Sequence, residues 1–284
     1  MNTLNNHFNK KNYLLISILA LLLLSKVTFS YGYSFSDSLE IKKKRSYLGS
    51  YFSDAGKLYS APFHWTGKDW FKAGVVAGTG LGIYALDDDI QQWSVSDRTK
   101  ASQDISSVAE KFGNTSSTTI ALGVTLVSGL IIKNQKMQDI SLLALKSSLL
   151  SGLLAQTIKN IGHRSRPNSG NSKNSWYGPA IGGKHKAFPS GHTATAFALA
   201  TTLSQVYKDK KWIAITSYSL ATVAGFSRIH DNKHWATDVF AGAVLGYFTS
   251  KTILKNEKKN GREISFQPSI QFTNPALTVL VSLN

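Results

Sequence analysis

The stretch 227-SRIHDNKHWATDVFAGAVLGYF-248 joins a polar segment to an apolar one. The polar part holds a serine, two basic residues, two histidines and two acids. The apolar part is rich in alanine, glycine and large hydrophobic residues, as in a helix that packs against other helices. His234 and Asp238 are four residues apart, so on a helix they share one face. The pattern predicts a packed helix with reactive side chains at its start.

Six apolar stretches, of which this is the last, predict an all-α fold built as a six-helix bundle. Their lengths and their content of Ala, Leu, Gly and Ser suit helices better than strands. A chain of 284 residues with 42% hydrophobic residues is long enough to bury one sizeable core. The stretches cover residues 71–86, 118–132, 140–158, 192–206, 212–226 and 236–254.

The two ends of the chain differ from the bundle. A polar, cationic start precedes an apolar run over 13–24, which has the length of a signal-peptide core, and small residues suit cleavage after Ser30. An uncleaved anchor is the alternative, and Lys26 disfavours it. At the other end, apolar residues at even positions, an Asn-Pro turn and the strand-like segment 276-ALTVLVSL-283 predict a small β hairpin.

The sequence therefore divides into four segments, and the chain is expected to be exported. We expect a signal peptide over 1–30, an N-terminal extension over 31–70, a helical bundle over 71–255 and a tail, with the hairpin, over 256–284.

Charge and cysteine content narrow the function classes. A formal net charge of +16, from 32 Lys and Arg against 16 Asp and Glu, favours anionic partners such as phosphorylated substrates or an anionic membrane surface. Nucleic acid is not expected as a partner, because the chain has no zinc finger, basic zipper or RNA-binding motif. The absence of cysteine excludes disulfides, a Cys nucleophile and Cys-based metal sites.

A second polar motif, 159-KNIGHRSRP-167, lies where the third apolar stretch ends. Pro167 stops the helix. Lys159 and Arg166 are seven residues apart, about two helical turns, so both can point into one pocket. By itself a basic helix end is commonly a solvated cap that complements the helix dipole.

A third motif, 188-FPSGHT-193, opens the fourth apolar stretch. Ser190 is a natural N-cap and Gly191 lets the backbone approach a ligand closely, so the free amides and dipole of this helix start form an anion site. His192 follows in the first turn, over that site. If neighbouring helices alternate in direction, this site, the basic motif, Arg228 and the His234–Asp238 pair all meet at one end of the bundle.

The combination describes a tetrahedral oxyanion site with two proton-active groups. Asp238 can accept the Nδ1 proton of His234 and leave Nε2 free, which makes His234 a candidate nucleophile. A His–Asp pair on a helix surface is the alternative for these two residues taken alone. The cations Lys159, Arg166 and Arg228, with the donors Ser190 and Gly191, surround the place of the anion.

The three motifs resemble the three-part signature of the type 2 phosphatidic acid phosphatase and vanadium haloperoxidase superfamily. Every signature position matches in order, and the resemblance covers about residues 70 to 255. The matching positions are Lys159, Arg166 and Pro167 in K-x6-RP, 189–192 in PSGH, and Ser227, Arg228, His234 and Asp238 in SR-x5-H-x3-D.

This resemblance implies a six-helix core and hydrolysis of phosphomonoesters or pyrophosphates through a phosphohistidine, without a metal or other cofactor. It implies that His234 attacks phosphorus, that Asp238 orients it, and that His192 protonates the leaving oxygen and then activates water. It also implies that the phosphate oxygens are held by Lys159, Arg166, Ser190, Gly191 and Arg228.

Several nearby residues are interpreted as outside the site. The residues His163, Arg164, His185 and His230 are expected at its rim, and the acids at 87–89 at a solvated helix end, because consecutive acids point in different directions. Trp176 and Tyr177 could shape an entrance for the organic part of the substrate.

We expect a lipid phosphate as substrate, of the phosphatidic acid, phosphatidylglycerophosphate, undecaprenyl pyrophosphate or lipid A type. A soluble, broad-specificity periplasmic acid phosphatase is the alternative, because the apolar stretches are short and interrupted by polar residues. A vanadate-dependent haloperoxidase, a non-catalytic lipid-phosphate-binding protein and a transporter are remoter alternatives. By the positive-inside rule, the basic segments at 207–211 and 251–259 predict a catalytic end on the periplasmic side. We expect a bundle that is peripheral or shallowly embedded, and an integral protein whose six apolar stretches all span the membrane is the alternative.

Overall fold

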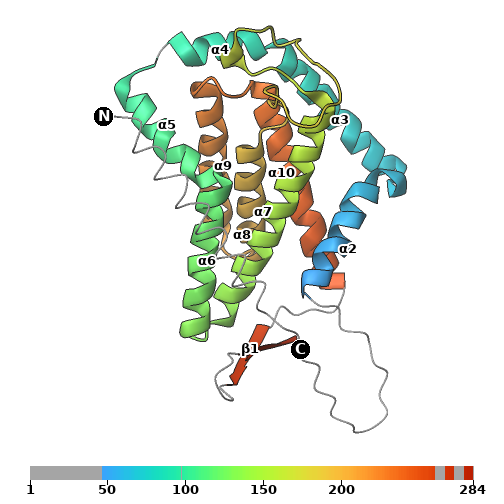
Figure 1. The fold of residues 1–284 in the computed structure, drawn as a ribbon, viewed down its shortest axis with the longest axis vertical. Coiled ribbons are helices and arrows are strands. Elements are labelled where there is room, and N and C mark those ends of the chain that lie inside the picture. Colours follow the sequence, from blue (N-terminus) through green and yellow to red (C-terminus); the bar gives the residue numbers. More distant parts are fainter. Residues whose placement is uncertain (1–46, 97, 260–265, 272–277, 284) are drawn as a thin grey trace. The chain divides into compact units, whose positions relative to one another are not determined.

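The computed structural model describes residues 47–96, 98–259, 266–271 and 278–283 (Figure 1). The expected signal peptide and the first part of the expected extension lie outside these residues. The chain divides into two compact units, one spanning Arg45–Ile264 and the other combining Met1–Lys44 with Ser265–Asn284. The larger unit is helical and carries all three sequence motifs.

All six apolar stretches form helices, which confirms the expected helical bundle. Three α-helices that were not expected, α2, α4 and α5, accompany them. The elements of this unit are α2 (Tyr47–Ser60), η1 (Ala61–His64), α3 (Gly67–Ala85), α4 (Asp87–Ser96), α5 (Lys100–Gly113), α6 (Thr115–Ile131), α7 (Gln135–Gly162), η2 (Pro167–Ser169), α8 (Gly191–Val206), α9 (Lys211–His230) and α10 (Ala236–Lys259).

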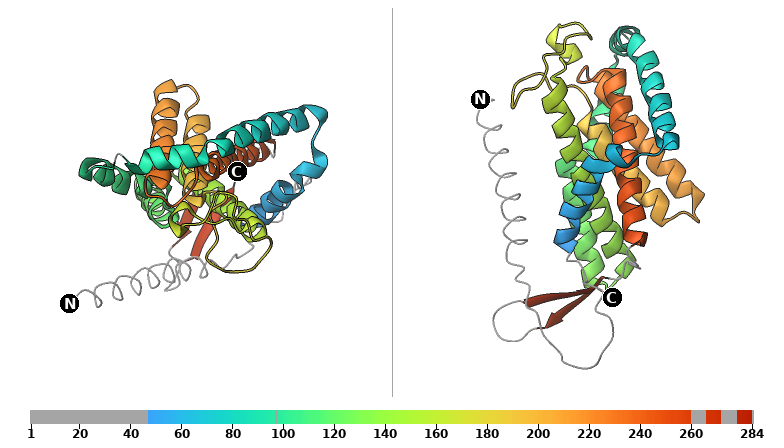
Figure 2. Two further views of the ribbon diagram at one scale, coloured as in Figure 1. Left: turned by 90° about the horizontal axis from the view of Figure 1, so that it is seen from above. Right: turned by 90° about the vertical axis from the view of Figure 1, so that its right-hand side faces the viewer.

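Helix α8 lies at the centre of the bundle and packs against α7, α9 and α10 (Figures 1 and 2). Two glycines of α10 permit a close approach to it. A Cβ atom at Gly242 would lie 2.4 Å from the carbonyl oxygen of Ser190, and one at Gly246 would lie 2.2 Å from that of Ala194. Larger residues at either glycine would force the helices apart. The start of α10 is thus held against the start of α8.

The helices α7 to α10 alternate in direction, so the polar motifs meet at one end of the bundle. The peptide N–H of Ser190 donates to the carbonyl oxygen of Asp238 at 2.8 Å, which joins the starts of α8 and α10. The N–H of Ala187 donates to the carbonyl oxygen of Arg164 at 3.0 Å, which joins the loop before α8 to the end of α7. The expected convergence of helix ends is therefore present.

A buried ion cluster attaches α2 to the bundle. The side chain of Lys146 on α7 is fully buried, and its Nζ lies 2.7 Å from Glu257 Oε1 and 2.8 Å from Ser50 Oγ. The same nitrogen also contacts the carboxylate of Asp54. Because a buried ammonium needs paired charge, this cluster ties α2 and α10 to the middle of α7. The part of the expected extension that begins at Tyr47 therefore packs as part of the helical unit.

The outer faces of several helices are apolar. Among the described residues, one helix, α7, is long and apolar enough to cross a membrane, and 56% of its most apolar 18-residue window is buried inside the protein. Large hydrophobic side chains are exposed on α3, α6 and α9, where they include Phe71, Leu81, Val124, Ile131, Trp212 and Ile215. Exposed apolar surface on this scale marks an interaction surface.

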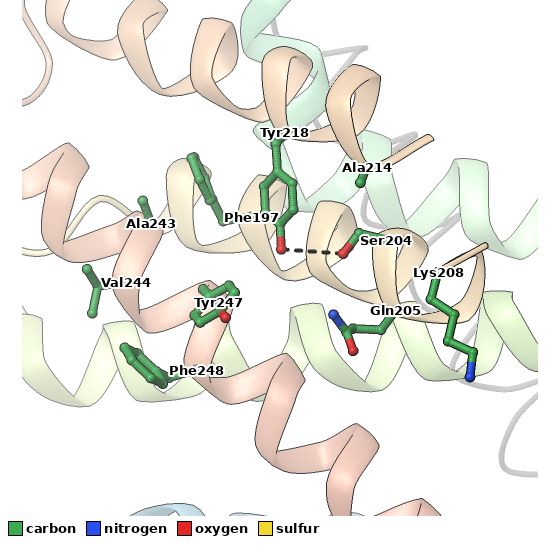
Figure 3. Close-up of a pocket in the computed structure, with 10 residues that line it drawn as sticks. All are labelled: Phe197, Ser204, Gln205, Lys208, Ala214, Tyr218, Ala243, Val244, Tyr247 and Phe248. Atoms are coloured by element: carbon green, nitrogen blue, oxygen red, sulfur yellow. Dashed lines mark hydrogen bonds between the residues drawn. The ribbon is translucent and has the colours of Figure 1, made fainter. Parts of the chain in front are cut away.

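A groove of about 560 Å³ lies between α8, α9 and α10 (Figure 3). Aromatic side chains from all three helices line it, and Lys208 stands at one end. Its lining includes Ser204 and Gln205, near the last turn of α8, so the groove lies toward the opposite end of that helix from Ser190. It is therefore separate from the convergence of the three motifs.

The smaller unit contains a two-stranded antiparallel sheet. Strand β1 (Phe266–Gln271) pairs with β2 (Thr278–Leu283), with Phe266 opposite Leu283. This is the hairpin that the alternating pattern predicts.

Candidate active site

His234 and Asp238 form the pair that their spacing predicts. Both side chains are buried, and His234 Nδ1 lies 3.5 Å from Asp238 Oδ2. This separation is longer than a normal hydrogen bond but short enough for an ionic contact, and the two groups face each other. The ring is thereby oriented with Nδ1 toward the carboxylate.

Asp238 is held on both of its oxygens. Oδ1 accepts a hydrogen bond of 2.7 Å from Arg164 Nη1, and Oδ2 accepts one of 2.9 Å from the N–H of Trp235. Arg164 is fully buried, so its expected position at the rim is wrong. A guanidinium is a better partner than water for a carboxylate that burial has removed from solvent, which explains why this arginine lies inside.

The acids at 87–89 do not all lie at a solvated helix end, and for Asp87 that interpretation is wrong. Asp87 is fully buried, and its Oδ2 lies 2.7 Å from Arg164 Nη2. Its Oδ1 accepts from the N–H of Thr237 at 2.8 Å, in the first turn of α10. Asp88, by contrast, is exposed and pairs with Lys173 at 3.0 Å. The three acids indeed point in different directions, and one of them points inward.

The start of α8 has the geometry expected of an anion site. Ser190 is the N-cap, and its Oγ accepts from the N–H of Thr193 at 3.4 Å and from Thr193 Oγ1 at 2.8 Å. The amides of Gly191 and His192 precede the first hydrogen bond within the helix, so they are available to a ligand. A Cβ at Gly191 would lie 3.9 Å from Cε of Lys159, which places this basic side chain beside the helix start.

Lys159 and Arg166 bring positive charge to the same place. Lys159 Nζ donates to the carbonyl oxygens of Lys186 and Ala187 at 2.6 and 3.2 Å. Arg166 Nε is buried and has no hydrogen-bond partner among the residues that the structure describes. A buried guanidinium nitrogen in this state suits the binding of an oxyanion.

Arg228, the third expected cation, is paired with two carboxylates. Its Nη2 lies 2.7 Å from Glu110 Oε2 and also contacts the carboxylate of Asp231. Glu110 belongs to α5. This helix approaches the start of α8 so closely that a Cβ atom at Gly113 would lie 2.6 Å from the carbonyl oxygen of His192. No sequence signal pointed to Glu110, since α5 itself was not expected.

Burial and nearby cations govern the ionisation of the site. Burial, assisted by Lys159 and Arg166, lowers the pKa of His234 to about 4 despite the opposing effect of Asp238. Burial and the charge of Arg228 lower the pKa of His192 to about 4. Burial lowers the pKa of Lys159 to about 8, although Asp238 opposes the shift. Both histidines are therefore neutral near pH 7, and Lys159 is charged.

The remaining histidines near the motifs have other partners. His163 Nε2 lies 2.6 Å from the carbonyl oxygen of Gly182, and His185 Nδ1 lies 2.9 Å from Ser165 Oγ, so both help to hold the loop between α7 and α8. His230 Nε2 lies 3.0 Å from Ser102 Oγ on α5.

An apolar cavity of about 570 Å³ lies beside the motifs, between α3, α7, α10 and the loop before α8. Three lining residues, Ile158, Pro189 and Thr237, directly adjoin Lys159, Ser190 and Asp238 in the sequence. Its remaining lining residues are Val76, Ala77, Gly80, Leu81, Tyr84, Trp176, Phe188, Phe240, Ala241, Val244 and Leu245. The expected entrance role of Trp176 is consistent with this position, whereas Tyr177 is exposed and stacks on His185 with ring centroids 4.2 Å apart.

The assembled groups can bind a tetrahedral oxyanion next to a neutral, oriented imidazole. The candidate anion site is surrounded by amides, by two cations without a carboxylate contact in the part of the chain that the structure describes, and by one carboxylate-paired cation. A second imidazole lies at the start of α8. Among the described residues, no group of three or more His, Asp or Glu side chains is placed to hold a metal ion.

Comparison with known proteins agrees with this geometry. Residues 141–262 match the family model described as PAP2 superfamily. The chain is 42% identical over 78 residues to the lipid A 1-phosphatase of Porphyromonas gingivalis, and 35% identical over 78 residues to the probable lipid phosphate phosphatase 4 of Arabidopsis thaliana. These matches cover 25% and 23% of this chain, but 18% and 25% of the respective relatives.

The fold has a counterpart among solved structures. A transmembrane PAP2-type phosphatidylglycerolphosphate phosphatase from Bacillus subtilis superimposes with a TM-score of 0.52 and 22% identity, over 66% of this chain and 97% of that one. This likeness shows that the two proteins share a fold.

We predict that Glu110→Gln strengthens the binding of inorganic phosphate by roughly 2- to 5-fold, because the carboxylate competes with an anion for Arg228 and is partly screened by solvent. Isothermal titration calorimetry measures the effect. Asp104→Asn, on the exposed face of the same helix, is the matched control and is expected to leave binding unchanged. Weaker phosphate binding by Glu110→Gln would show that Glu110 supports the site instead.

Proposed function

We propose, from the match of residues 141–262 to the PAP2 superfamily model, that the chain is a metal-independent phosphatase that acts through a phosphohistidine. The single observation that carries the proposal is the buried His234–Asp238 pair, at an anion site lined by Lys159, Arg166 and the start of α8. Anion binding alone would need the cations and amides but no oriented imidazole. The superfamily relatives are named as lipid phosphatases, in keeping with a phosphoric monoester hydrolase.

In the proposed reaction, Nε2 of neutral His234 attacks phosphorus, and the bond between phosphorus and the leaving oxygen breaks. His192, itself neutral, takes a proton from the phosphate monoanion of the substrate and passes it to that oxygen. Asp238 supports the positive charge that develops on the attacking ring. Water then attacks the phosphohistidine, His192 takes a proton from it, and the nitrogen–phosphorus bond breaks to release inorganic phosphate.

The charge that develops on the phosphoryl oxygens is stabilised by built-in groups. Five residues hold these oxygens, and no metal ion is required in this scheme because the donors and cations belong to the protein. They are Lys159, Arg166, Ser190, Gly191 and Arg228. Glu110 and Asp231 both contact Nη2 of Arg228, so a phosphate oxygen that binds this nitrogen competes with their carboxylates.

A lipid phosphate is the substrate that we propose. The apolar cavity adjoins the anion site at three points of the chain and has no charged residue in its lining, so it suits a hydrocarbon chain whose phosphate lies at the anion site. A soluble phosphate ester would leave this apolar surface uncovered. The alternative, a broad-specificity acid phosphatase, remains a distinct outcome of the experiments below.

We further propose that the protein is exported and associates with the membrane, with the active site on the periplasmic side. The exposed apolar side chains of α3, α6 and α9 support membrane association, and the basic segments at 207–211 and 251–259 support the orientation. Membrane retention after an alkaline carbonate wash measures the association, and protease protection of spheroplasts measures the orientation. Cleavage of the loop between α7 and α8 is expected from outside, and its protection would contradict the orientation.

The proposed activity is tested by phosphate release from a panel of lipid and soluble phosphates. We predict that His234→Ala lowers kcat by about 10⁴-fold or more, because no other group replaces the nucleophile. Labelled phosphate is expected on histidine in the wild-type chain after an acid-free quench. His64→Ala, at an exposed position, is the control. Turnover by His234→Ala at the wild-type rate would overturn the assignment.

We predict that kcat/KM is greatest between about pH 4 and about pH 6. Below pH 4 His234 becomes protonated and loses its nucleophilic lone pair. Above about pH 6 the phosphate monoester loses its second proton, and neutral His192 can no longer obtain from the substrate the proton that the leaving group needs. A further loss is expected above about pH 8, where Lys159 loses its charge. A kcat/KM that rises from pH 6 to pH 8 would contradict this scheme.

We predict that Ala77→Trp lowers kcat/KM for lipid phosphates by about 10-fold or more and spares p-nitrophenyl phosphate, because the indole fills the cavity and not the anion site. Val75→Trp is the matched control, since Val75 is an exposed residue of the same helix that does not line the cavity. Equal losses for both substrates would indicate distortion of the site, and no loss for either would favour the soluble acid phosphatase.

A further inference from the structure

Arg164 joins two carboxylates, those of Asp238 and Asp87, of which only Asp238 has a role in the proposed reaction. Nη1 donates to Asp238 Oδ1 and Nη2 to Asp87 Oδ2, each at 2.7 Å, and Nε donates to the carbonyl oxygen of Lys173 at 3.1 Å. All three charged side chains are fully buried. The proposed chemistry uses Asp238 but gives no role to Arg164 or Asp87.

Aromatic rings enclose the guanidinium. Its Cζ lies 4.9 Å from the ring centroid of Tyr84, 5.1 Å from that of Trp176 and 5.5 Å from that of Trp235. The enclosure excludes water and fixes the plane of the fork, so its two nitrogens point in set directions. A displacement of the Asp87 carboxylate would therefore displace Arg164 and, with it, the Asp238 carboxylate.

Asp87 fixes the second end of this arrangement. It opens α4, and it accepts the N–H of Thr237 at 2.8 Å and contacts Thr237 Oγ1. Thr237 precedes Asp238 in the first turn of α10. Asp87 thus reaches the catalytic turn by two routes, through the backbone next to Asp238 and through Arg164 to its carboxylate.

The two routes determine which oxygen faces the histidine. Arg164 occupies Oδ1 of Asp238, which leaves Oδ2, held by the N–H of Trp235, directed at His234 Nδ1. Rotation of the carboxylate would break the bond to the guanidinium and leave buried charge unpaired, which is costly. The orientation of the His234 ring therefore depends on the Asp238 carboxylate, which cannot rotate without breaking its bond to Arg164.

We propose, on the basis of the proposed phosphatase activity, that Asp87 and Arg164 are positioning residues for His234, acting through Asp238. The buried sequence Asp87–Arg164–Asp238–His234 aligns the attacking nitrogen with phosphorus and makes α4 part of the active site, although α4 supplies no group that touches the substrate. The sites of phosphate binding, at Lys159, Arg166 and the start of α8, do not include this network.

The test compares Asp87→Asn with Asp88→Asn, which changes the same charge at the next, exposed position. Asp87→Asn is expected to lower kcat by about 10- to 100-fold, the usual effect of a small displacement of a reacting group, while KM changes by less than about 2-fold. Asp88→Asn is expected to behave as the wild type. Arg164→Lys is expected to match the loss in Asp87→Asn, because one ammonium keeps the charge but cannot reach both carboxylates as the fork does.

Two inhibitors separate positioning from general damage. Inorganic phosphate reports on the anion site, whereas orthovanadate resembles the transition state and also depends on the attacking nitrogen. In Asp87→Asn, the inhibition constant of phosphate is expected to stay within about 2-fold, and that of orthovanadate to rise in proportion to the loss of kcat. A variant that merely disturbs folding would weaken both inhibitors together, and this result would overturn the proposal.

Non-additivity provides the remaining check. The double variant Asp87→Asn/Arg164→Lys is expected to be as active as the less active of the two single variants, because both changes break one network. If Asp87→Asn yields too little folded protein, Thr237→Val loosens the same carboxylate without a change of charge and should give a smaller effect of the same kind. Wild-type kcat in Asp87→Asn and Arg164→Lys contradicts the network alone, whereas a wild-type chain that releases no phosphate contradicts the proposed function.

Discussion

Asp238 is a carboxylate with no access to solvent, and the arrangement of the active end follows from how its charge is compensated. A buried charge is tolerated only when it is paired and hydrogen-bonded. The partner is Arg164, which must itself be buried, and whose second nitrogen requires a further buried acceptor, Asp87. Pairing of the Asp238 charge therefore brings the end of α7, the start of α4 and the start of α10 into contact.

The close packing of α8 and α10 serves the same end of the bundle. Gly242 and Gly246 bring the two helix backbones together, and the N–H of Ser190 bonds to the carbonyl oxygen of Asp238. The anion site at the start of α8 and the His–Asp pair at the start of α10 are consequently parts of one rigid corner. Since a helix start offers free amides without any movement of the chain, the site is pre-organised for an oxyanion.

The carboxylates around Arg228 and the apolar cavity add selectivity to this corner. Glu110 and Asp231 pair with Nη2 of Arg228, so the proposed phosphate would compete with carboxylates for this nitrogen. The cavity between α3, α7 and α10 offers a surface without charged residues next to a strongly cationic site. A molecule with a phosphate at one end and a hydrocarbon chain at the other would fit both features, which is the physical reason for proposing a lipid phosphate in preference to a small soluble ester.

The six long helices were predictable from the sequence, because apolar periodicity is a local property, and the local spacing of helix-end residues led to the proposed phosphate-binding and catalytic residues. The unexpected helices α2, α4 and α5 are shorter and more polar, and only their packing against the bundle reveals them. The surroundings of three further residues depend on the tertiary structure: Asp87 was expected at a solvated helix end, Arg164 at the rim of the site, and Glu110 was not noticed. Whether an acid is solvated or buried depends on residues far away along the chain: Asp87 lies inside because Arg164, 77 positions later, needs a second carboxylate.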